Sequence, residues 1–198
     1  MDLLKAMQVT AAARKDTSTK PNDHHQISQI LNTDIFNKYL EKYKLSGSMN
    51  KGENDPPSSG ATTQVSIIDK NGNAASVTTT NGEGCGYLIP ELGVMLNNML
   101  GEEDLNPSGF HNFSHQQRLP TMISPTVIMD DHRPELVLGS GGSNRIRSAI
   151  LQVILNYFNK GMSLDEAVTT SRIHLEGNIL HCEPDISSEI ENKLPDGI

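Results

Sequence analysis

The chain has 198 residues, of which 35% are hydrophobic and 20% are charged, with no tryptophan and a formal net charge of −8 at pH 7. This length and composition are typical of a globular domain with its own core, and the acidic balance excludes nucleic acid as a partner, because phosphates require a basic surface. No apolar run approaches the length of a membrane span, and residues 1–16 lack the apolar segment and cleavage site of a secretory signal.

The N-terminal quarter of the chain is predicted to be helical. Residues 1–14 resemble an amphipathic helix, and residues 27–40 carry apolar side chains at helical spacing after a polar break. Thr33 is a plausible cap between two short helices in this second stretch. Residues 46–61 are dominated by Gly, Ser, Asn and Pro, which cannot bury enough apolar surface to offset chain entropy, so a flexible linker is expected there.

The pattern changes to strands and helices at Thr62. The segments TQVSIID and NAASVTTT alternate around Asn71-Gly72, which predicts a β-hairpin. The later elements, in chain order, are strands at 124–129 and 135–140, a helix at 145–161 with an apolar stripe (Ile146, Ile150, Val153, Ile154, Phe158), a short helix with a Ser163–Glu166 capping box, and a hairpin at 173–183. Hairpins followed by helices predict an α+β fold with antiparallel sheet covered by helices.

The position of Thr62, between the linker and the first strand, has chemical meaning. A threonine hydroxyl is a poor nucleophile without a base, and a threonine that begins a chain carries its own α-amino group, with a pKa of about 7.7–8.0, to take the proton. The precursor would cut itself between Ala61 and Thr62: the hydroxyl attacks the preceding carbonyl, an ester forms, and water releases the upstream piece. On this position alone, a threonine with no role beyond starting a strand is the simpler interpretation.

Four ordered segments resemble the γ-glutamyltransferases: TTQVSIIDKNGNAASVTTTN, GVMLNNML, SPTVIM and LGSGGSNRIRSAILQVI. In that family a proenzyme cuts itself into a large and a small subunit, and the small subunit begins at the nucleophilic threonine. The resemblance covers residues 62–198, with a fainter match of residues 1–16 to the end of the large subunit. It implies an N-terminal-nucleophile (Ntn) hydrolase fold, a four-layer αββα sandwich of which this chain holds only part.

The resemblance divides the chain into three regions. Residues 1–45 are the helical end of a large-subunit-like region, residues 46–61 are the linker that ends at the self-cleavage site, and residues 62–198 are the small-subunit-like catalytic region. The family has a few hundred further residues before the linker, and its last strands extend beyond this C-terminus. We therefore expect a fragment that needs a large-subunit-like partner to cover its apolar surface.

The resemblance also assigns catalytic roles. Thr62 is the nucleophile and, through its freed amine, the base, and Thr80 either steadies that amine or is an ordinary β-branched strand residue. The oxyanion donors are the backbone amides of Gly142 and Ser143, because N–H groups at a glycine-rich turn leading into a helix can meet the developing charge. A shift of one position would make the pair Gly141 and Gly142.

Substrate-binding residues follow from the same resemblance. Glu102 falls where an acidic residue holds the α-amino group of the glutamyl substrate, with Glu103 and Asp104 as rivals and a solvated acidic loop as the alternative. Asn81 lies beside the family's substrate-contacting asparagine, offset by one residue.

The hydroxyl pair that contacts the substrate α-carboxylate in the family is incomplete here. Thr121 replaces the first hydroxyl, whereas Met122 cannot replace the second. The predicted pocket therefore differs from that of a standard member, although the acyl-transfer residues are retained.

The function implied is hydrolysis or transpeptidation of γ-glutamyl amides such as glutathione, with water, an amino acid or a peptide as acceptor and with neither a metal nor an organic cofactor. Because of Met122, the alternative that the protein is a relative that hydrolyses another acyl amide, as glutaryl or cephalosporin acylases do, remains open. A catalytically silent fragment, serving as a subunit or interaction module, is the alternative from another class. Family members are often periplasmic or cell-surface, but this sequence assigns no compartment. Cys85 and Cys182 are expected to be unpaired thiols rather than a single bridge.

Overall fold

The computed structural model describes residues 2–17, 33–42, 50–51, 62–106, 109–113, 115–116 and 118–186. The chain forms two compact units. Unit 1 comprises Met1–Asn54, Glu103–Pro120 and Ile173–Ile198, and unit 2 comprises Asp55–Glu102 and Thr121–Arg172.

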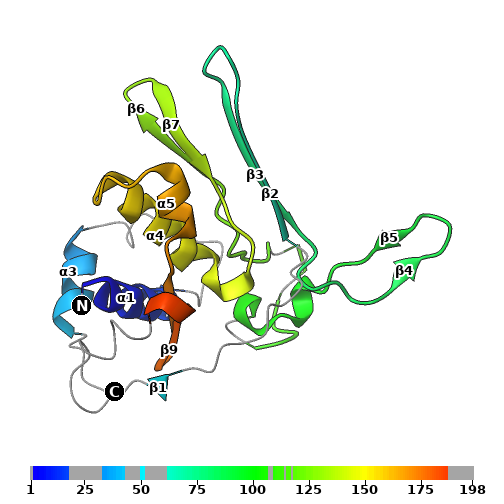
Figure 1. Ribbon diagram of the computed structural model, residues 1–198. Helices are drawn as coiled ribbons and strands as arrows, with labels where there is room; N and C mark the ends of the chain where they lie inside the picture. Colours follow the sequence, from blue (N-terminus) through cyan, green and yellow to red (C-terminus); the bar gives the residue numbers. More distant parts are fainter. Residues whose placement is uncertain are drawn as a thin grey trace. The chain divides into compact units, whose positions relative to one another are not determined.

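Unit 1 combines helices with a three-stranded sheet (Figure 1). Its elements are α1 (Asp2–Thr17), α3 (Thr33–Lys42), β1 (Asn50–Lys51), η2 (Glu103–Leu105), β8 (Ile173–Glu176), β9 (Ile179–Cys182) and η4 (Pro184–Ile186). The predicted hairpin is present as β8 and β9, whose antiparallel pairing buries Leu175 and Leu180 against Leu4 of α1. Strand β1, which lies inside the predicted linker, pairs in parallel with β9. The composition of the linker did not indicate a strand there. The rest of that linker and the predicted helical residues 27–32 lie outside the described residues.

The described residues of unit 2 form three hairpins, two α-helices and two short 3-10 helices (Figure 1). Its elements are β2 (Thr62–Ile68), β3 (Ala74–Thr80), β4 (Leu88–Ile89), β5 (Val94–Met95), η1 (Met99–Gly101), β6 (Thr126–Asp130), β7 (Arg133–Leu138), η3 (Ser143–Arg145), α4 (Ile146–Phe158) and α5 (Leu164–Thr169). The β2–β3 and β6–β7 hairpins lie beside each other, with β7 in contact with both β2 and β3. This contact places the segment that follows β7 near the start of β2.

The two helices of unit 2 follow the predicted pattern in most positions. Ile146, Ile150 and Val153 are buried, and burying each contributes about 1.5–3 kcal/mol. Phe158, predicted to belong to the same stripe, is 41% exposed at the end of α4, so that prediction is wrong at this residue. The capping box of α5 is present as predicted: the Ser163 hydroxyl accepts from the backbone N–H of Glu166, whose carboxylate accepts from the Ser163 N–H.

The turn between β2 and β3 is organised by the carboxylate of Asp69. One oxygen accepts from the backbone N–H groups of Asn71 (2.8 Å) and Asn73 (2.9 Å), and the other accepts from the Asn73 side chain (2.8 Å). The Gly72 N–H donates to the Asp69 carbonyl (3.0 Å), so Lys70 and Asn71 are the central residues of the turn. Gly72 follows them with a left-handed φ of 83°, which makes a three-residue loop rather than a two-residue Asn-Gly turn. The hydrogen bonds from the Asn73 side chain and backbone hold the pKa of Asp69 below its ordinary value.

This turn gives a pH-dependent prediction for stability. Because the folded pKa of Asp69 is depressed, its contribution is present above the unfolded pKa of about 3.9 and is lost as pH falls through the folded pKa. We expect Asp69→Ala to lower the melting temperature at pH 7 and to have a smaller effect near pH 2. Lys70→Ala in the same turn is the matched control and should change the melting temperature little at either pH. Equal losses for Asp69→Ala at both pH values would contradict this role.

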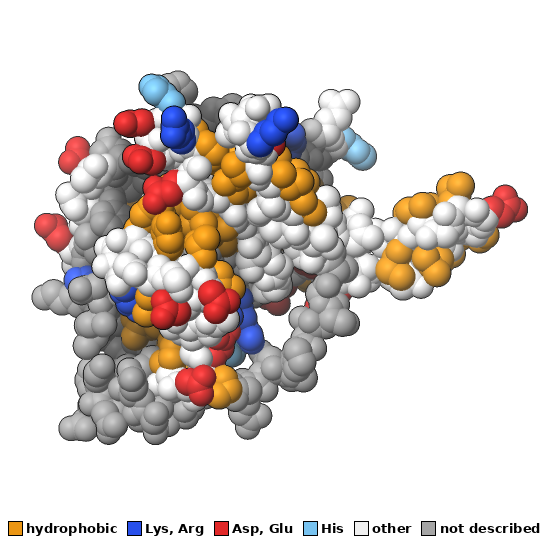
Figure 2. Space-filling view, turned by 45° about the horizontal axis from the view of Figure 1, so that its top comes forward, with side chains coloured by type: hydrophobic (Ala, Val, Ile, Leu, Met, Phe, Trp, Pro, Cys, Tyr) orange, Lys and Arg blue, Asp and Glu red, His pale blue; other side chains and the backbone are white. Residues whose placement is uncertain are grey.

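Unit 2 exposes apolar side chains on an arm, defined as residues 87–96, that contains the β4–β5 hairpin. Tyr87, Leu88 and Leu92 are each more than half exposed, and Figure 2 shows apolar side chains gathered along this projecting arm. Met95 on β5 is 38% exposed. Within the described ranges, no helix is long and apolar enough to cross a membrane. No disulfide joins Cys85 and Cys182 within the described residues, in line with the expectation of two thiols.

Candidate active site

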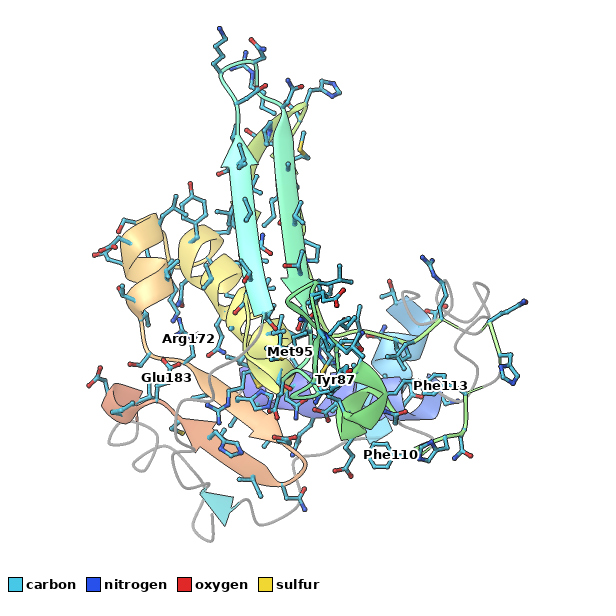
Figure 3. The ribbon with its side chains drawn as sticks, turned by 90° about the vertical axis from the view of Figure 1, so that its right-hand side faces the viewer. Tyr87, Met95, Phe110, Phe113, Arg172 and Glu183 are labelled. Atoms are coloured by element: carbon cyan, nitrogen blue, oxygen red, sulfur yellow. The ribbon has the colours of Figure 1, made fainter. Side chains whose placement is uncertain are left out.

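Two threonines face each other at the open end of the β2–β3 hairpin. Thr62 is the first residue of β2 and Thr80 is the last residue of β3, and the antiparallel register pairs them directly. Their hydroxyl oxygens lie 2.9 Å apart, within hydrogen-bond distance, and both residues are half-buried. Figure 3 shows the two strands side by side, with side chains on both faces of the hairpin. The neighbouring Thr63 is paired with Thr79, and both are exposed.

The glycine-rich turn after β7 lies directly against Thr62. A Cβ atom at Gly141 would be 3.2 Å from the Cβ of Thr62 and 3.3 Å from its carbonyl oxygen, so glycine allows the close approach. Gly142 and Ser143 have positive φ angles of 116° and 52°, and the second of these is uncommon for a residue other than glycine. Such strain in a turn is a feature of functional sites, and here it occurs beside the half-buried threonine pair.

The same turn has the electrostatic character needed to bind an oxyanion. Within the described part of the chain, the N–H groups of Gly142 and Ser143 donate no hydrogen bond. The 13-residue helix α4 begins three residues after Ser143, and the partial positive charge of its N-terminus favours an anion at this end. The turn therefore combines donors that are unpaired among the described residues with a field that favours an anion, and its Gly141 packs against Thr62.

The side chain of Gln64 fixes the turn relative to the hairpin. Its amide nitrogen donates to the hydroxyls of Ser66 and Ser76 (2.9 Å each), and its amide oxygen accepts from the Thr78 hydroxyl. Ser76 in turn donates to the carbonyl of Leu138 at the end of β7 (3.0 Å). Gly139, the next residue, has no room for a Cβ because the Gln64 amide occupies that space. Sequence reasoning did not identify this role of Gln64, since Ser76 and Thr78 lie on the opposite strand, 12 and 14 residues away.

A second turn, residues 80–83, connects the threonine pair with Glu102. The backbone N–H of Gly82 donates to the Thr80 hydroxyl (3.0 Å), and Gly82 has a φ of 67°. A Cβ at Gly82 would overlap a carboxylate oxygen of Glu102 and the amide oxygen of Asn98. The Glu102 carboxylate therefore lies against Gly82, and Gly82 follows Thr80 by two residues in sequence.

The other predicted substrate residues are placed less directly. The Asn81 side chain is exposed and donates to the carbonyl of Met95 (3.5 Å), a residue labelled in Figure 3. Thr121 is exposed, and its hydroxyl accepts from the Ile123 N–H (3.3 Å) within its own segment. Among the described residues, neither side chain is hydrogen-bonded to Thr62. Their predicted contacts with substrate remain predictions.

Met122 contacts a cation at the start of α4. It is 5% exposed, and its sulfur accepts from a guanidinium nitrogen of Arg147 at 3.7 Å. The position for which the family resemblance gives a second hydroxyl is thus occupied by a buried thioether. Glu103 and Asp104, the rivals of Glu102, belong to η2 of unit 1.

The predicted cleavage bond is only partly visible. Thr62 is described, whereas Ala61 lies outside the described residues. No group of three His, Cys, Asp or Glu side chains that could hold a metal ion is found within the described ranges.

Comparisons with known proteins give one family. The family model described as gamma-glutamyltranspeptidase matches residues 1–197. The glutathione hydrolase proenzyme of Bacillus subtilis (strain 168) is 35% identical over 156 residues, which cover 74% of this chain and 26% of the relative. The acylase ACY 1 proenzyme of Pseudomonas sp. (strain SE83) is 33% identical over 135 residues, which cover 67% of this chain and 24% of the relative. The chain thus spans about a quarter of the length of these relatives.

Solved structures give the same result. A Thr→Ala mutant of the Helicobacter pylori gamma-glutamyltranspeptidase is similar with a TM-score of 0.56 and 28% sequence identity. The similarity covers 66% of this chain and 81% of that chain.

Proposed function

Because the chain belongs to the gamma-glutamyltranspeptidase family, we propose that it is the threonine-bearing part of a self-processing amidohydrolase and acyltransferase that acts on γ-glutamyl amides such as glutathione. The family assignment made from the four sequence motifs is confirmed, and so is the partial α+β fold of the Ntn-hydrolase type. The observation that carries the proposal is the 2.9 Å contact between the hydroxyls of Thr62 and Thr80, with Gly141 packed on Thr62.

Maturation would begin at the bond before Thr62. The Thr62 hydroxyl attacks the carbonyl carbon of Ala61, the C–N bond breaks, and the nitrogen gains a proton to become the free α-amine. Water then hydrolyses the ester, which leaves a carboxylate on Ala61 and restores the hydroxyl. The product is a threonine that carries nucleophile and base on one residue.

Turnover would use the same atoms in two steps. The α-amine takes the hydroxyl proton as Thr62 attacks the γ-carbonyl carbon, and the oxyanion is stabilised by the N–H groups of Gly142 and Ser143. The protonated amine donates to the leaving nitrogen as the amide bond breaks, giving a γ-glutamyl ester and a free amine product. Water or the amine of an amino acid or peptide then attacks the ester, and the Thr62 hydroxyl is regenerated. In this scheme the hydroxyl and amine of Thr62 and the backbone N–H groups supply the nucleophile, the base and the oxyanion donors.

Glu102 is proposed to bind the α-ammonium group of the γ-glutamyl donor. Its carboxylate lies over Gly82, whose N–H is bonded to Thr80, so a donor held at Thr62 would extend toward this charge.

Removing the charge of Glu102 should affect donors with an α-amino group more than donors without one. For the full-length protein, we expect kcat/KM with a γ-glutamyl anilide to exceed that with a glutaryl anilide, which lacks the α-amine. Glu102→Gln should lower kcat/KM about 10- to 100-fold for the first donor, the scale of a charge-assisted bond of 1.5–3 kcal/mol, and should leave the second within a few-fold. Glu103→Gln is the matched control and should leave kcat/KM unchanged for both donors. Equal wild-type rates on both donors would refute the assignment of Glu102.

A second candidate function is hydrolysis of a different acyl amide, such as a glutaryl side chain. The specific observation in its favour is the buried thioether of Met122, and the similarity to an acylase proenzyme supports it. Faster turnover of the glutaryl anilide than of the γ-glutamyl anilide would establish this second function in place of the first.

The direct test of the proposal is hydrolysis of a γ-glutamyl anilide by the full-length protein, together with its intact mass. The expected masses include a piece that begins at Thr62. A full-length protein that stays uncut and inactive after long incubation would favour the silent subunit or interaction module instead.

A further inference from the structure

The 80–83 turn is bonded on both sides of Gly82 by one residue, Asn98. The backbone N–H of Asn98 donates to the carbonyl of Asn81 (3.2 Å), and its side-chain amide oxygen accepts from the N–H of Glu83 (2.8 Å). All of these residues belong to unit 2. Asn98 thus determines the position of the turn that carries Gly82.

Gly82 transmits this position to the threonine pair. Its N–H donates to the Thr80 hydroxyl at 3.0 Å, so one lone pair of that oxygen is already engaged. The Thr80 hydroxyl also lies 2.9 Å from the Thr62 hydroxyl. A hydroxyl that accepts one hydrogen bond is polarised to donate another, so the Gly82 bond favours donation from Thr80 to the Thr62 oxygen. Such a donor would stabilise charge on the attacking oxygen.

The absence of a side chain at Gly82 leaves room for Asn98 and Glu102 above the turn. The Asn98 amide oxygen and the Glu102 carboxylate both occupy the space where a Cβ at residue 82 would lie. The two side chains are therefore neighbours above the turn. Displacing Asn98 would release the turn and also remove the side chain against which Glu102 rests.

We propose that Asn98 is a positioning residue that fixes Thr80 against Thr62, and Glu102 beside them, by bonding to the turn on both sides of Gly82. This inference rests on the proposed function only for its kinetic test. Asn97 is the matched control, since it is exposed and precedes Asn98 directly. Among the described residues, its side chain accepts only from the Met99 N–H (3.1 Å).

The kinetic test compares Asn98→Ala with Asn97→Ala in the full-length protein on both anilides. A misplacement of about 1 Å can cost about 10²-fold in rate, so we expect kcat of Asn98→Ala to fall about 10- to 100-fold on both donors. The ratio of kcat/KM between the γ-glutamyl and the glutaryl donor should also fall, because Glu102 loses its neighbour. In Asn97→Ala, both kcat and this ratio should stay within twofold of the wild type. Asn98→Asp retains the acceptor for the Glu83 N–H and should recover most of kcat, which a general loss of folding would not allow.

A second measurement does not depend on turnover. Native-state hydrogen exchange should show faster exchange of the Gly82 N–H in Asn98→Ala than in the wild type or Asn97→Ala, although Asn98 does not bond that N–H directly. Unchanged Gly82 exchange, or kcat values for Asn98→Ala and Asn97→Ala that agree, would overturn the positioning role. A wild type that turns over neither anilide would instead overturn the proposed function, and the exchange result would still decide the role of Asn98.

Discussion

Thr62→Ala is expected to abolish both self-cleavage and turnover, with a loss in kcat of about 10⁴-fold or more, the scale seen when a nucleophile is removed from a preformed site. The methyl side chain has no oxygen to attack either the preceding carbonyl or a γ-glutamyl amide. Thr62 also provides the half-buried partner of the Thr80 hydroxyl, 2.9 Å away. The measurements are the intact mass after incubation and the initial rate on a γ-glutamyl anilide.

Thr63→Ala is the matched control for this change. Thr63 is adjacent in sequence, has the same side chain, and is exposed. Both self-cleavage and turnover should persist within a few-fold in this variant. If Thr62→Ala is cut as readily as Thr63→Ala, the cut is made by another protease, and Thr62 is not the nucleophile.

Thr80→Val is expected to reduce kcat about 10²-fold, since removing one donor that faces developing charge costs roughly that much. Valine keeps the β-branched shape that the end of β3 requires, so the hairpin should be retained. The lost hydroxyl leaves the Thr62 oxygen without its partner and the Gly82 N–H without its acceptor. The rate of self-cleavage should fall with kcat, and both can be followed in one preparation.

Thr79→Val, one residue earlier on the exposed side of β3, controls for this substitution. It should leave kcat within a few-fold, because Thr79 faces Thr63 rather than Thr62. Equal kcat values for the two variants would show that Thr80 is only a strand residue, the interpretation that the sequence left open.

Local patterns were enough to predict most elements of unit 2. Alternation around Asn71-Gly72 predicted the β2–β3 hairpin, and Ser163 with Glu166 predicted the cap of α5. These features depend on residues a few positions apart, where side-chain chemistry acts directly on the backbone. The pairing of Thr62 with Thr80 follows from the register of that same hairpin, once the strand limits are known.

Features that depend on distant residues were not predictable in the same way. The amide of Gln64 joins Ser76 and Thr78 across the hairpin, and Ser76 reaches Leu138, which is 62 residues away in sequence. The position of Asn98 over Gly82 depends likewise on how the chain returns after the arm. Phe158 fits a helical stripe in sequence but lies at the helix end, where less of the unit covers it.

The described β2–β3 ladder starts at Thr62, so the nitrogen of the bond proposed to be cut belongs to a residue that is already in register with Thr80. Scission there would leave each strand pairing from Thr62 to Ile68 in place. Activation would then leave the described hairpin in register: the Thr62 nitrogen changes from an amide into an amine that can accept a proton, and Ala61 gains a carboxylate.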